Sequence, residues 1–129
     1  MSGADADGKQ YVLIADDEPS MRLLVTATIA SDRIGVLEAA DGHEAWAQIQ
    51  LHRPDLVLLD VQMPGLTGLD LARRLRADPT FDGIKIVMLT SKAQTTDIEA
   101  GLAAGADLYL TKPFSPISLL TYVEGALGL

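Results

Sequence analysis

Four short apolar runs constrain the fold of this chain more than any other feature. The runs cover residues 11–15, 56–59, 84–89 and 108–111. Each is far shorter than the roughly 20 apolar residues that a membrane-spanning helix needs. The runs are apolar on both faces, and segments of helical periodicity separate them. This alternation predicts a parallel sheet that is covered by helices on both sides.

The segments between the runs carry signals of helices. Pro19 suits a first helical position, where its missing N–H costs nothing, and Asp41 and Ser115 suit N-caps. The first helix should bury a stripe made of Met21, Leu24, Val25, Thr28 and Ile29. The expected strands lie at 11–15, 36–39, 55–60, 84–89 and 107–111. The expected helices lie at 19–29, 42–51, 68–77, 94–104 and 116–127.

Composition limits the class of protein. Eighteen acidic and ten basic residues give a net charge of −8, which opposes direct nucleic-acid binding, because that relies on Lys and Arg. The basic cluster Arg73, Arg74 and Arg76 suits a solvated helix face. The chain has no cysteine, which excludes disulfides, and its start lacks the apolar region of a signal peptide. We therefore expect a cytoplasmic domain at 10–129, with no membrane contact, behind a flexible tail at 1–9.

Residues that can handle a phosphoryl group stand where four of the strands end. They are Asp16, Asp17, Asp60, Thr90 and Lys112. Ligands of open parallel sheets bind at the carboxyl ends of the strands. Taken singly, an aspartate after a strand is an ordinary cap or turn residue. Converging carboxylates repel one another unless a cation joins them, and Mg²⁺ prefers such hard oxygen ligands. A carboxylate beside Mg²⁺ can attack phosphorus, and a hydroxyl and an ammonium can stabilise the phosphoryl oxygens.

The same residues belong to a series of motifs along the chain. The motifs are Asp16-Asp17-Glu18, Leu58 to Gly65, Gly68, Leu89-Thr90-Ser91, Ala104 to Asp107, and Tyr109 to Phe114. In order and spacing, over about residues 10–128, they resemble a response-regulator receiver domain. The resemblance implies a flavodoxin-like, doubly wound (βα)5 fold of strand order 2-1-3-4-5. It also implies that Asp60 accepts a phosphoryl group from a histidine kinase or a histidine phosphotransfer protein.

The resemblance further implies a magnesium site in the acidic pocket. Asp17, Asp60 and the backbone carbonyl of Gln62 would bind Mg²⁺ directly. Asp16 would lie one layer behind them and orient a water.

The resemblance also implies how phosphorylation is detected. Thr90 and Lys112 would contact the phosphoryl oxygens, and Lys112-Pro113 would be a cis peptide. Tyr109 would move inward as Thr90 is drawn to the phosphate. Without the resemblance, Tyr109 would be an ordinary strand tyrosine with its hydroxyl in water. The helix expected at 94–104 contains an internal Gly101 and is intrinsically weak, as suits a segment that changes conformation.

The last helix suggests where partners bind. Glu124 is its only charged residue, and its apolar residues spread more widely than one core stripe requires. We therefore expect the face formed by the helix at 94–104, the last strand and the last helix to bind a protein partner. A phosphorylation-dependent homodimer through that face is an alternative occupant.

Three functional settings remain open. A Met at position 1 and the absence of a trailing linker favour a stand-alone receiver that acts through protein partners. The alternative is a receiver module of a longer regulator with a DNA-binding or enzymatic output. A remote third is a small Mg²⁺-dependent phosphohydrolase, although its nucleophile motif would then have to be Asp16-x-Glu18.

Overall fold

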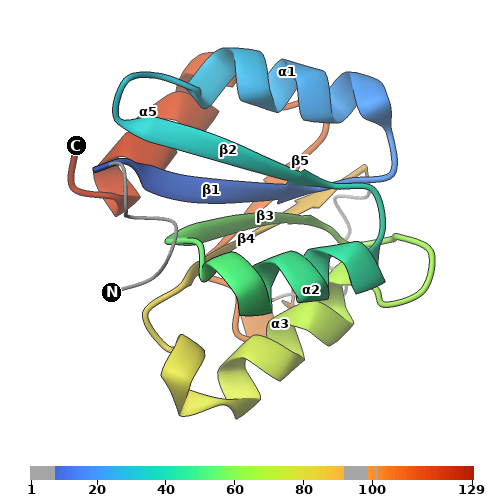
Figure 1. Cartoon of the computed structure of the whole chain (residues 1–129). Coiled ribbons are helices and arrows are strands. Elements are labelled where there is room, and N and C mark those ends of the chain that lie inside the picture. Colours follow the sequence, from blue (N-terminus) through green and yellow to red (C-terminus); the bar gives the residue numbers. More distant parts are fainter. Residues whose placement is uncertain (1–7, 92–98, 101) are drawn as a thin grey trace.

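A five-stranded parallel sheet lies between two layers of helices. The computed structural model describes residues 8–91, 99–100 and 102–129. The strand order is β2-β1-β3-β4-β5. Helices α1 and α5 cover one face of the sheet, and α2 and α3 cover the other (Figure 1). The elements are β1 (Gln10–Ala15), α1 (Pro19–Ile29), β2 (Ile34–Ala39), α2 (Gly42–His52), β3 (Leu56–Asp60), α3 (Gly68–Ala77), the 3-10 helix η2 (Pro79–Phe81), β4 (Lys85–Thr90), β5 (Leu108–Thr111) and α5 (Pro116–Ala126). The predicted fold class and strand order are confirmed.

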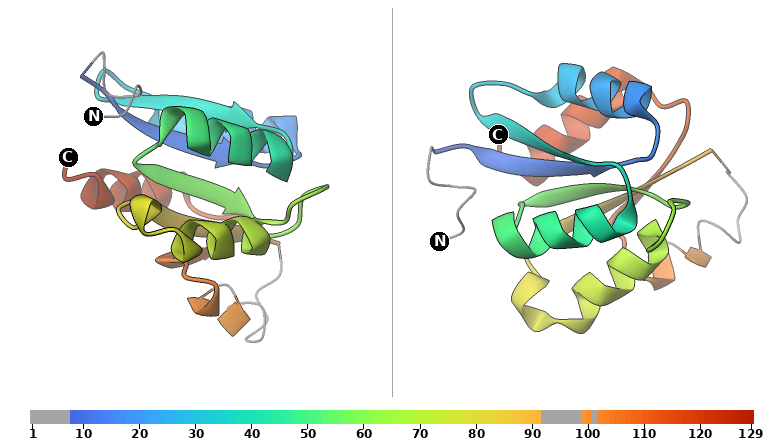
Figure 2. Two further views of the ribbon diagram at one scale, coloured as in Figure 1. Left: turned by 60° about the horizontal axis from the view of Figure 1, so that its bottom comes forward. Right: turned by 45° about the vertical axis from the view of Figure 1, so that its right-hand side comes forward.

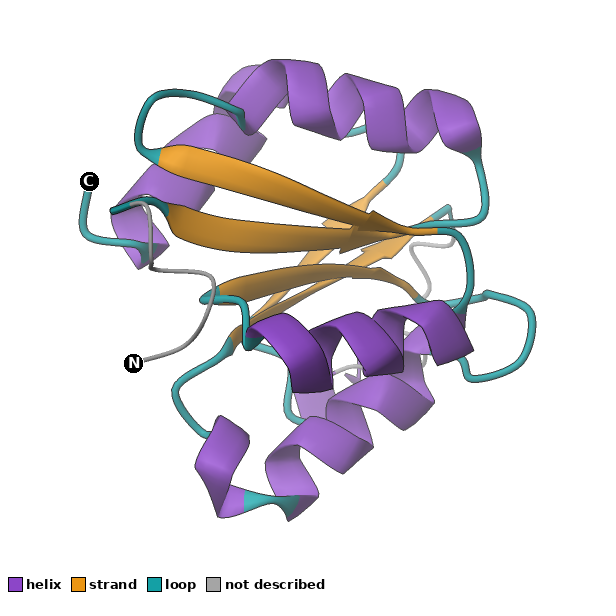
Figure 3. Cartoon of the chain, viewed as in Figure 1, coloured by secondary structure: helices purple, strands orange, loops and turns teal. Residues whose placement is uncertain are grey.

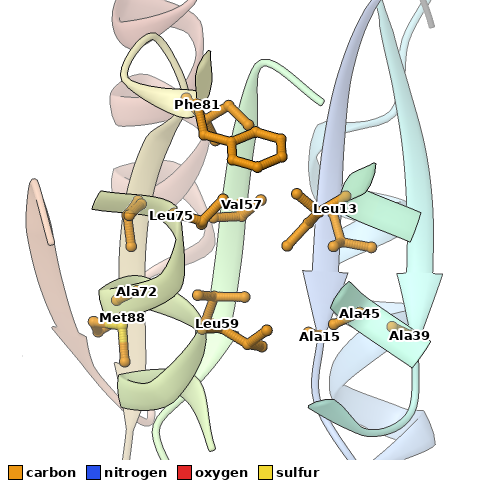
Figure 4. Packing of buried hydrophobic residues seen from close by; sticks show 14 of the residues in the cluster. Leu13, Ala15, Ala39, Ala45, Val57, Leu59, Ala72, Leu75, Phe81 and Met88 are labelled. Carbon is orange, nitrogen blue, oxygen red and sulfur yellow. The ribbon is translucent and has the colours of Figure 1, made fainter. Parts of the chain in front are cut away.

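Alternate residues of the central strands belong to two separate hydrophobic cores, one on each face of the sheet. Leu13, Val57 and Leu59 pack toward α2 and α3, where Leu75, Met88 and Phe81 join them (Figure 4). Their neighbours along the strands, including Ile14 and Leu58, pack toward α1 and α5. Because successive strand residues point to opposite faces, a strand buried on both sides must be apolar throughout. This explains the uninterrupted apolar runs of the sequence.

The helix starts follow the predicted caps, with one addition. The Asp41 carboxylate accepts a hydrogen bond from the backbone N–H of Glu44 at 2.8 Å, and the Ser115 hydroxyl caps α5 through the N–H of Ser118. Both predicted caps are confirmed. A reciprocal capping box of Thr67 and Asp70 starts α3, although the sequence interpretation overlooked it. Such boxes satisfy two backbone N–H groups that a helix start leaves unpaired.

Several predicted details were wrong. Leu24 is 41% exposed, because the core face of α1 is narrower than the predicted stripe and centres on Val25 and Ile29. Strand β2 begins two residues early, at Ile34, because β1 pairs with it from Gln10 onward. The 3-10 helix η2 was not predicted, although its signal is present: the Asp78 carboxylate accepts from the backbone N–H of Thr80.

The helix predicted at 94–104 lies mainly outside the described residues, which record helix at 99–100 and 102–103. Gly105 follows with a φ of +102°, a left-handed conformation that glycine commonly adopts just after a helix. Its carbonyl accepts a hydrogen bond from Arg76, which also donates to Ile84 O and to the Asp107 carboxylate. Arg76 is therefore a clamp between α3, β4 and the start of β5, and its assignment to a solvated face was wrong. No helix in the described part of the chain is long and apolar enough to span a membrane.

Candidate functional site

The predicted site residues gather at the carboxyl edge of the sheet, where all the strand arrows end (Figures 2 and 3). Asp60 is the last residue of β3 and pairs with Leu89, next to Thr90 at the end of β4. Thr90 pairs in turn with Thr111 of β5, immediately before Lys112. Asp16 follows the last residue of β1. Asp16, Asp60 and Thr90 are the buried polar residues among those described.

Asp16 is held through every polar atom it has. Its N–H donates to Ala39 O of β2 at 3.1 Å, and its own carbonyl accepts from Arg22 at 2.7 Å. One carboxylate oxygen accepts from the N–H of Glu18 at 2.9 Å, and the other from Nζ of Lys112 at 2.7 Å. The side chain is fully buried. Asp16 is therefore a fixed anion that pairs with the buried ammonium, and each of its carboxylate oxygens can still accept a further hydrogen bond.

Lys112 lies among three carboxylates. Besides the contact with Asp16, its Nζ is 3.6 Å from a carboxylate oxygen of Asp60 and 3.9 Å from one of Glu18. Burial by itself lowers the pKa of the Lys112 ammonium. The hydrogen bond to Asp16 and the charges of Asp60 and Glu18 outweigh burial, and the pKa stays above its ordinary value. Lys112 is thus a permanent cation beside Asp60. The Lys112–Pro113 peptide bond that follows it is cis.

Asp60 is an unusually basic carboxylate. Burial, together with the nearby negative charge of Asp16, raises its pKa from 3.8 to about 6, although Lys112 opposes the shift. The N–H of Gln62 also donates to the Asp60 carboxylate, at 3.2 Å. The start of α3 packs closely against the backbone of Asp60. At Gly68, the first residue of α3, a Cβ would overlap the carbonyl oxygen of Asp60. A carboxylate that resists ionisation attracts cations and is a better nucleophile than a fully solvated one.

The acidic pocket offers oxygens to a metal ion. Carboxylate oxygens of Asp16, Asp17 and Glu18 lie within 4.8 Å of one another. Asp17 and Glu18 are exposed, and within the described residues the Asp17 carboxylate makes no hydrogen bond or ion pair. Hard oxygen donors with open access to water fit Mg²⁺, which keeps several waters in its coordination shell. Glu18, which the sequence interpretation did not assign to the magnesium site, belongs to this group and also lies near Lys112.

Thr90 and Tyr109 lie on the neighbouring strands β4 and β5. The carbonyl of Thr90 accepts a hydrogen bond from the N–H of Lys112 at 2.6 Å, which joins the ends of the two strands. Tyr109 pairs with Met88 and packs against the core on the α2 and α3 side. Its hydroxyl is buried and, among the described residues, has no hydrogen-bond partner. The interpretation of Tyr109 as a solvated strand tyrosine was therefore wrong.

The chain is thus a doubly wound α/β domain whose buried strand-end aspartates lie beside one lysine. Residues 12–124 match the family model described as the response regulator receiver domain. The chain belongs to this family, which acts in two-component signalling.

Several relatives are similar over almost the whole chain. The DNA-binding response regulator MtrA of Mycolicibacterium smegmatis is 41% identical over 119 residues, which are 92% of this chain and 51% of MtrA. The phosphate regulon transcriptional regulatory protein PhoB of Pseudomonas aeruginosa is 40% identical over 116 residues, 90% of this chain and 51% of PhoB. The chain thus spans about half the length of the curated relatives it matches.

Solved structures show the same architecture. The chemotaxis protein CheY4 of Vibrio cholerae superimposes with a TM-score of 0.84 at 34% identity, covering 92% of this chain and 99% of that one. A response regulator from Chloroflexus aurantiacus gives a TM-score of 0.86, also at 34% identity, covering 94% and 99%.

Proposed function

We propose that this domain is a phosphorylation-operated switch in which Asp60 accepts a phosphoryl group from a histidine kinase or a histidine phosphotransfer protein. The observation that carries the proposal is the placement of Asp60: a buried carboxylate with a raised pKa, 3.6 Å from a permanent ammonium and beside an acidic pocket. The family to which the chain belongs supports the same chemistry. On this proposal residues 10–129 are the receiver domain, and it acts in the cytoplasm.

The chemistry follows from the positions of the side chains. A carboxylate oxygen of Asp60 attacks phosphorus and forms the new O–P bond, while the bond from phosphorus to the donor's nitrogen or acyl oxygen breaks. Lys112 stabilises the charge on the phosphoryl oxygens, and the Thr90 hydroxyl donates to another oxygen. Mg²⁺, when bound, offsets the charge of the carboxylates and of the phosphoryl group. Asp17, Asp60 and the Gln62 carbonyl would hold it, and Asp16 would orient one of its waters.

Phosphorylation then has to alter a surface that partners recognise. Thr90 and Lys112 lie at the ends of β4 and β5, so contacts that they make with phosphate would bear directly on both strands and on Tyr109, which belongs to β5. We expect Tyr109 to couple the phosphate to the face formed by residues 99–100 and 102–104, β5 and α5. That face would bind a protein partner or, alternatively, a second copy of this domain.

The comparisons favour a receiver module of a longer regulator over a stand-alone receiver. The curated relatives named above are about twice as long, and their names describe DNA-binding or transcriptional regulators. On this proposal the receiver itself does not contact nucleic acid, and an additional domain does. Immunodetection of the native protein tests this directly, since a module predicts a mass about twice the 13.7 kDa of this chain, whereas a stand-alone receiver predicts 13.7 kDa.

The phosphoacceptor assignment is tested with a small acyl phosphate and Mg²⁺. Intact mass spectrometry should show one added phosphoryl group that is labile to hydroxylamine, as an acyl phosphate must be. Asp60→Asn should abolish the addition. Asp41→Asn is the matched control, because Asn caps a helix as well as Asp and Asp41 lies in the next loop of the same edge. Addition at another residue would refute the assignment. Many turnovers without an accumulating phosphoprotein would favour the phosphohydrolase alternative.

A further inference from the structure

Arg22 of α1 contacts the backbone of the acidic pocket, whereas Lys112 contacts its carboxylates. Its Nη1 donates to the backbone carbonyl of Asp16 at 2.7 Å, and its Nε donates to the carboxylate of Glu38 at 3.2 Å. The Arg22 side chain is only 17% exposed, whereas that of Glu38 is 48% exposed. A planar guanidinium can donate in two directions at once, and here it uses both.

The contact with Glu38 extends around the edge of the sheet. Glu38 lies in β2, the edge strand, and its carbonyl accepts a hydrogen bond from Nε2 of Gln48 at 2.6 Å. Gln48 belongs to α2, which covers the face of the sheet opposite to α1 (Figure 1). Gln48, Glu38 and Arg22 therefore form a strap that passes around β2 from one helix layer to the other. The strap ends on the carbonyl of Asp16.

That carbonyl belongs to the peptide unit that joins Asp16 to Asp17. Its orientation fixes where the Asp17 backbone begins, and so where the exposed Asp17 carboxylate points. Within the described residues, hydrogen bonds hold Asp16 on every side, whereas Asp17 makes none with its carboxylate. The position of Asp17 thus depends on the peptide that Arg22 holds. We propose that Arg22 is a positioning residue for the metal pocket, which holds the Asp16–Asp17 peptide so that Asp17 faces the cation. The inference rests on the proposed function, because it concerns the same magnesium site.

Charge and position have opposite effects at this residue, which makes the role testable. Arg22 is a cation near a cation site, so its charge alone weakens Mg²⁺ binding, and its removal would tighten binding by a few-fold. If Arg22 positions the pocket, its removal weakens binding instead. Residues that hold metal ligands in place from behind commonly change metal affinity by about 10- to 100-fold. Arg22 acts through one peptide bond, so we expect the lower end, about tenfold.

The experiment measures the dissociation constant of Mg²⁺ by isothermal titration calorimetry on the unphosphorylated protein. Arg22→Met keeps the aliphatic stem and removes the charge and both donors. Arg22→Lys keeps the charge and loses the planar fork. We expect both variants to bind Mg²⁺ about tenfold more weakly than the original protein. Tighter or unchanged binding by Arg22→Met overturns the proposal. Thermal unfolding in EDTA checks that both variants fold. If Arg22→Met does not fold, the Mg²⁺ dissociation constant of Arg22→Lys alone decides the test.

Glu38 provides a matched pair of controls. Glu38→Gln keeps an oxygen acceptor for Arg22, and Glu38→Ala removes it, while both remove the same negative charge. We expect Glu38→Ala to weaken Mg²⁺ binding more than Glu38→Gln, and equal constants for the two variants would contradict the strap. A failure of the positioning role is distinct from a failure of the proposed function. In the first case the original protein still binds Mg²⁺ and is phosphorylated on Asp60, but in the second it does neither.

Discussion

The centre of the sheet and its β5 edge differ in how firmly the surrounding structure holds them. Every residue of β3 is buried, as are the last four of β1, whereas every residue of β5 is only half-buried. The proposed acceptor Asp60 ends the first kind of strand, and Tyr109 lies on the second. Both strands contribute to one functional site.

On the proposed function, the two regions would have separate tasks. Acceptance of a phosphoryl group needs carboxylates held at fixed distances, and densely packed strands provide that because they deform little. Response to the phosphate needs an element that can shift at modest cost, and regions of low burial open at lower free energy than the core. The predictions below test this contrast, from the largest expected effect to the smallest.

The largest effect should come from matched leucine truncations on the α1 and α5 side of the sheet. Leu58 of β3 is fully buried, and Leu110 of β5 packs against the same cluster but is half-buried. We expect Leu58→Ala to lower the free energy of unfolding by about 3–5 kcal/mol, because it leaves a cavity, and Leu110→Ala by about half as much. Urea denaturation followed by circular dichroism measures both. Equal losses would show that β5 is as firmly held as the centre.

A substitution at Gly105 tests how firmly Arg76 holds the segment that leads into β5. Its φ of +102° disfavours any other residue, and a Cβ there would overlap Cγ of Arg76. We expect Gly105→Ala to cost about 2–3 kcal/mol of unfolding free energy, since backbone strain adds to disturbance of the Arg76 clamp. Gly83→Ala is the control, because nothing lies within 4 Å of its Cβ position, and it should be nearly neutral. A neutral Gly105→Ala would show that the Arg76 clamp adjusts freely.

The raised pKa of Asp60 predicts that this buried residue at the centre of the sheet lowers the free energy of unfolding at neutral pH. Its pKa of about 6 lies above the 3.8 of an exposed aspartate, so the folded protein binds a proton more readily than the unfolded chain. Stability should therefore fall as the pH rises from about 4 to 6 and remain low above that range. In EDTA, Asp60→Asn should raise the free energy of unfolding by about 1–3 kcal/mol at pH 7.5. The gain should vanish near pH 4, and a gain that is independent of pH would point to another cause.

Trp46 should give the smallest effect. Its ring packs edge-on against Phe81 at 5.8 Å, and Arg74 lies 5.4 Å above it. These partners belong to the α2 and α3 side, and among the described residues no aromatic or cation–π contact joins the ring to a site residue. We expect its fluorescence to change little when Mg²⁺ or an acyl phosphate is added. A large quench would show that the rearrangement extends beyond the β5 edge into α2.

The sequence predicted the architecture because the fold depends on patterns that are local. Apolar runs, caps such as Asp41 and Ser115, and the residue type at each strand end are all visible without tertiary structure. The same patterns brought Asp16, Asp60, Thr90 and Lys112 to one edge of the sheet, because parallel strands end together. Their catalytic roles, which came from the family resemblance, remain predictions.

The contacts that the sequence did not predict join residues far apart in the chain. Arg22 meets Glu38 across 16 positions, and Arg76 meets Asp107 across 31. An arginine on a helix has the same local signature whether it is solvated or clamps a distant carbonyl. Leu24 shows the converse, since its spacing suits a core position and only the packing of α1 leaves it exposed. Polar contacts between residues far apart in the chain could therefore not be predicted from the sequence.

Lys112 touches three carboxylates with a single ammonium group. A phosphoryl group on Asp60 would add a stronger anion to the same small space, and one lysine cannot keep all its former neighbours at their present distances. Some of its attraction to Asp16 or Glu18 must then be given up. On the proposed function, several anions would therefore compete for one cation, and the outcome would differ between unphosphorylated and phosphorylated Asp60. Since α5 begins four residues after Lys112, the change would reach a helix without any movement of the central strands.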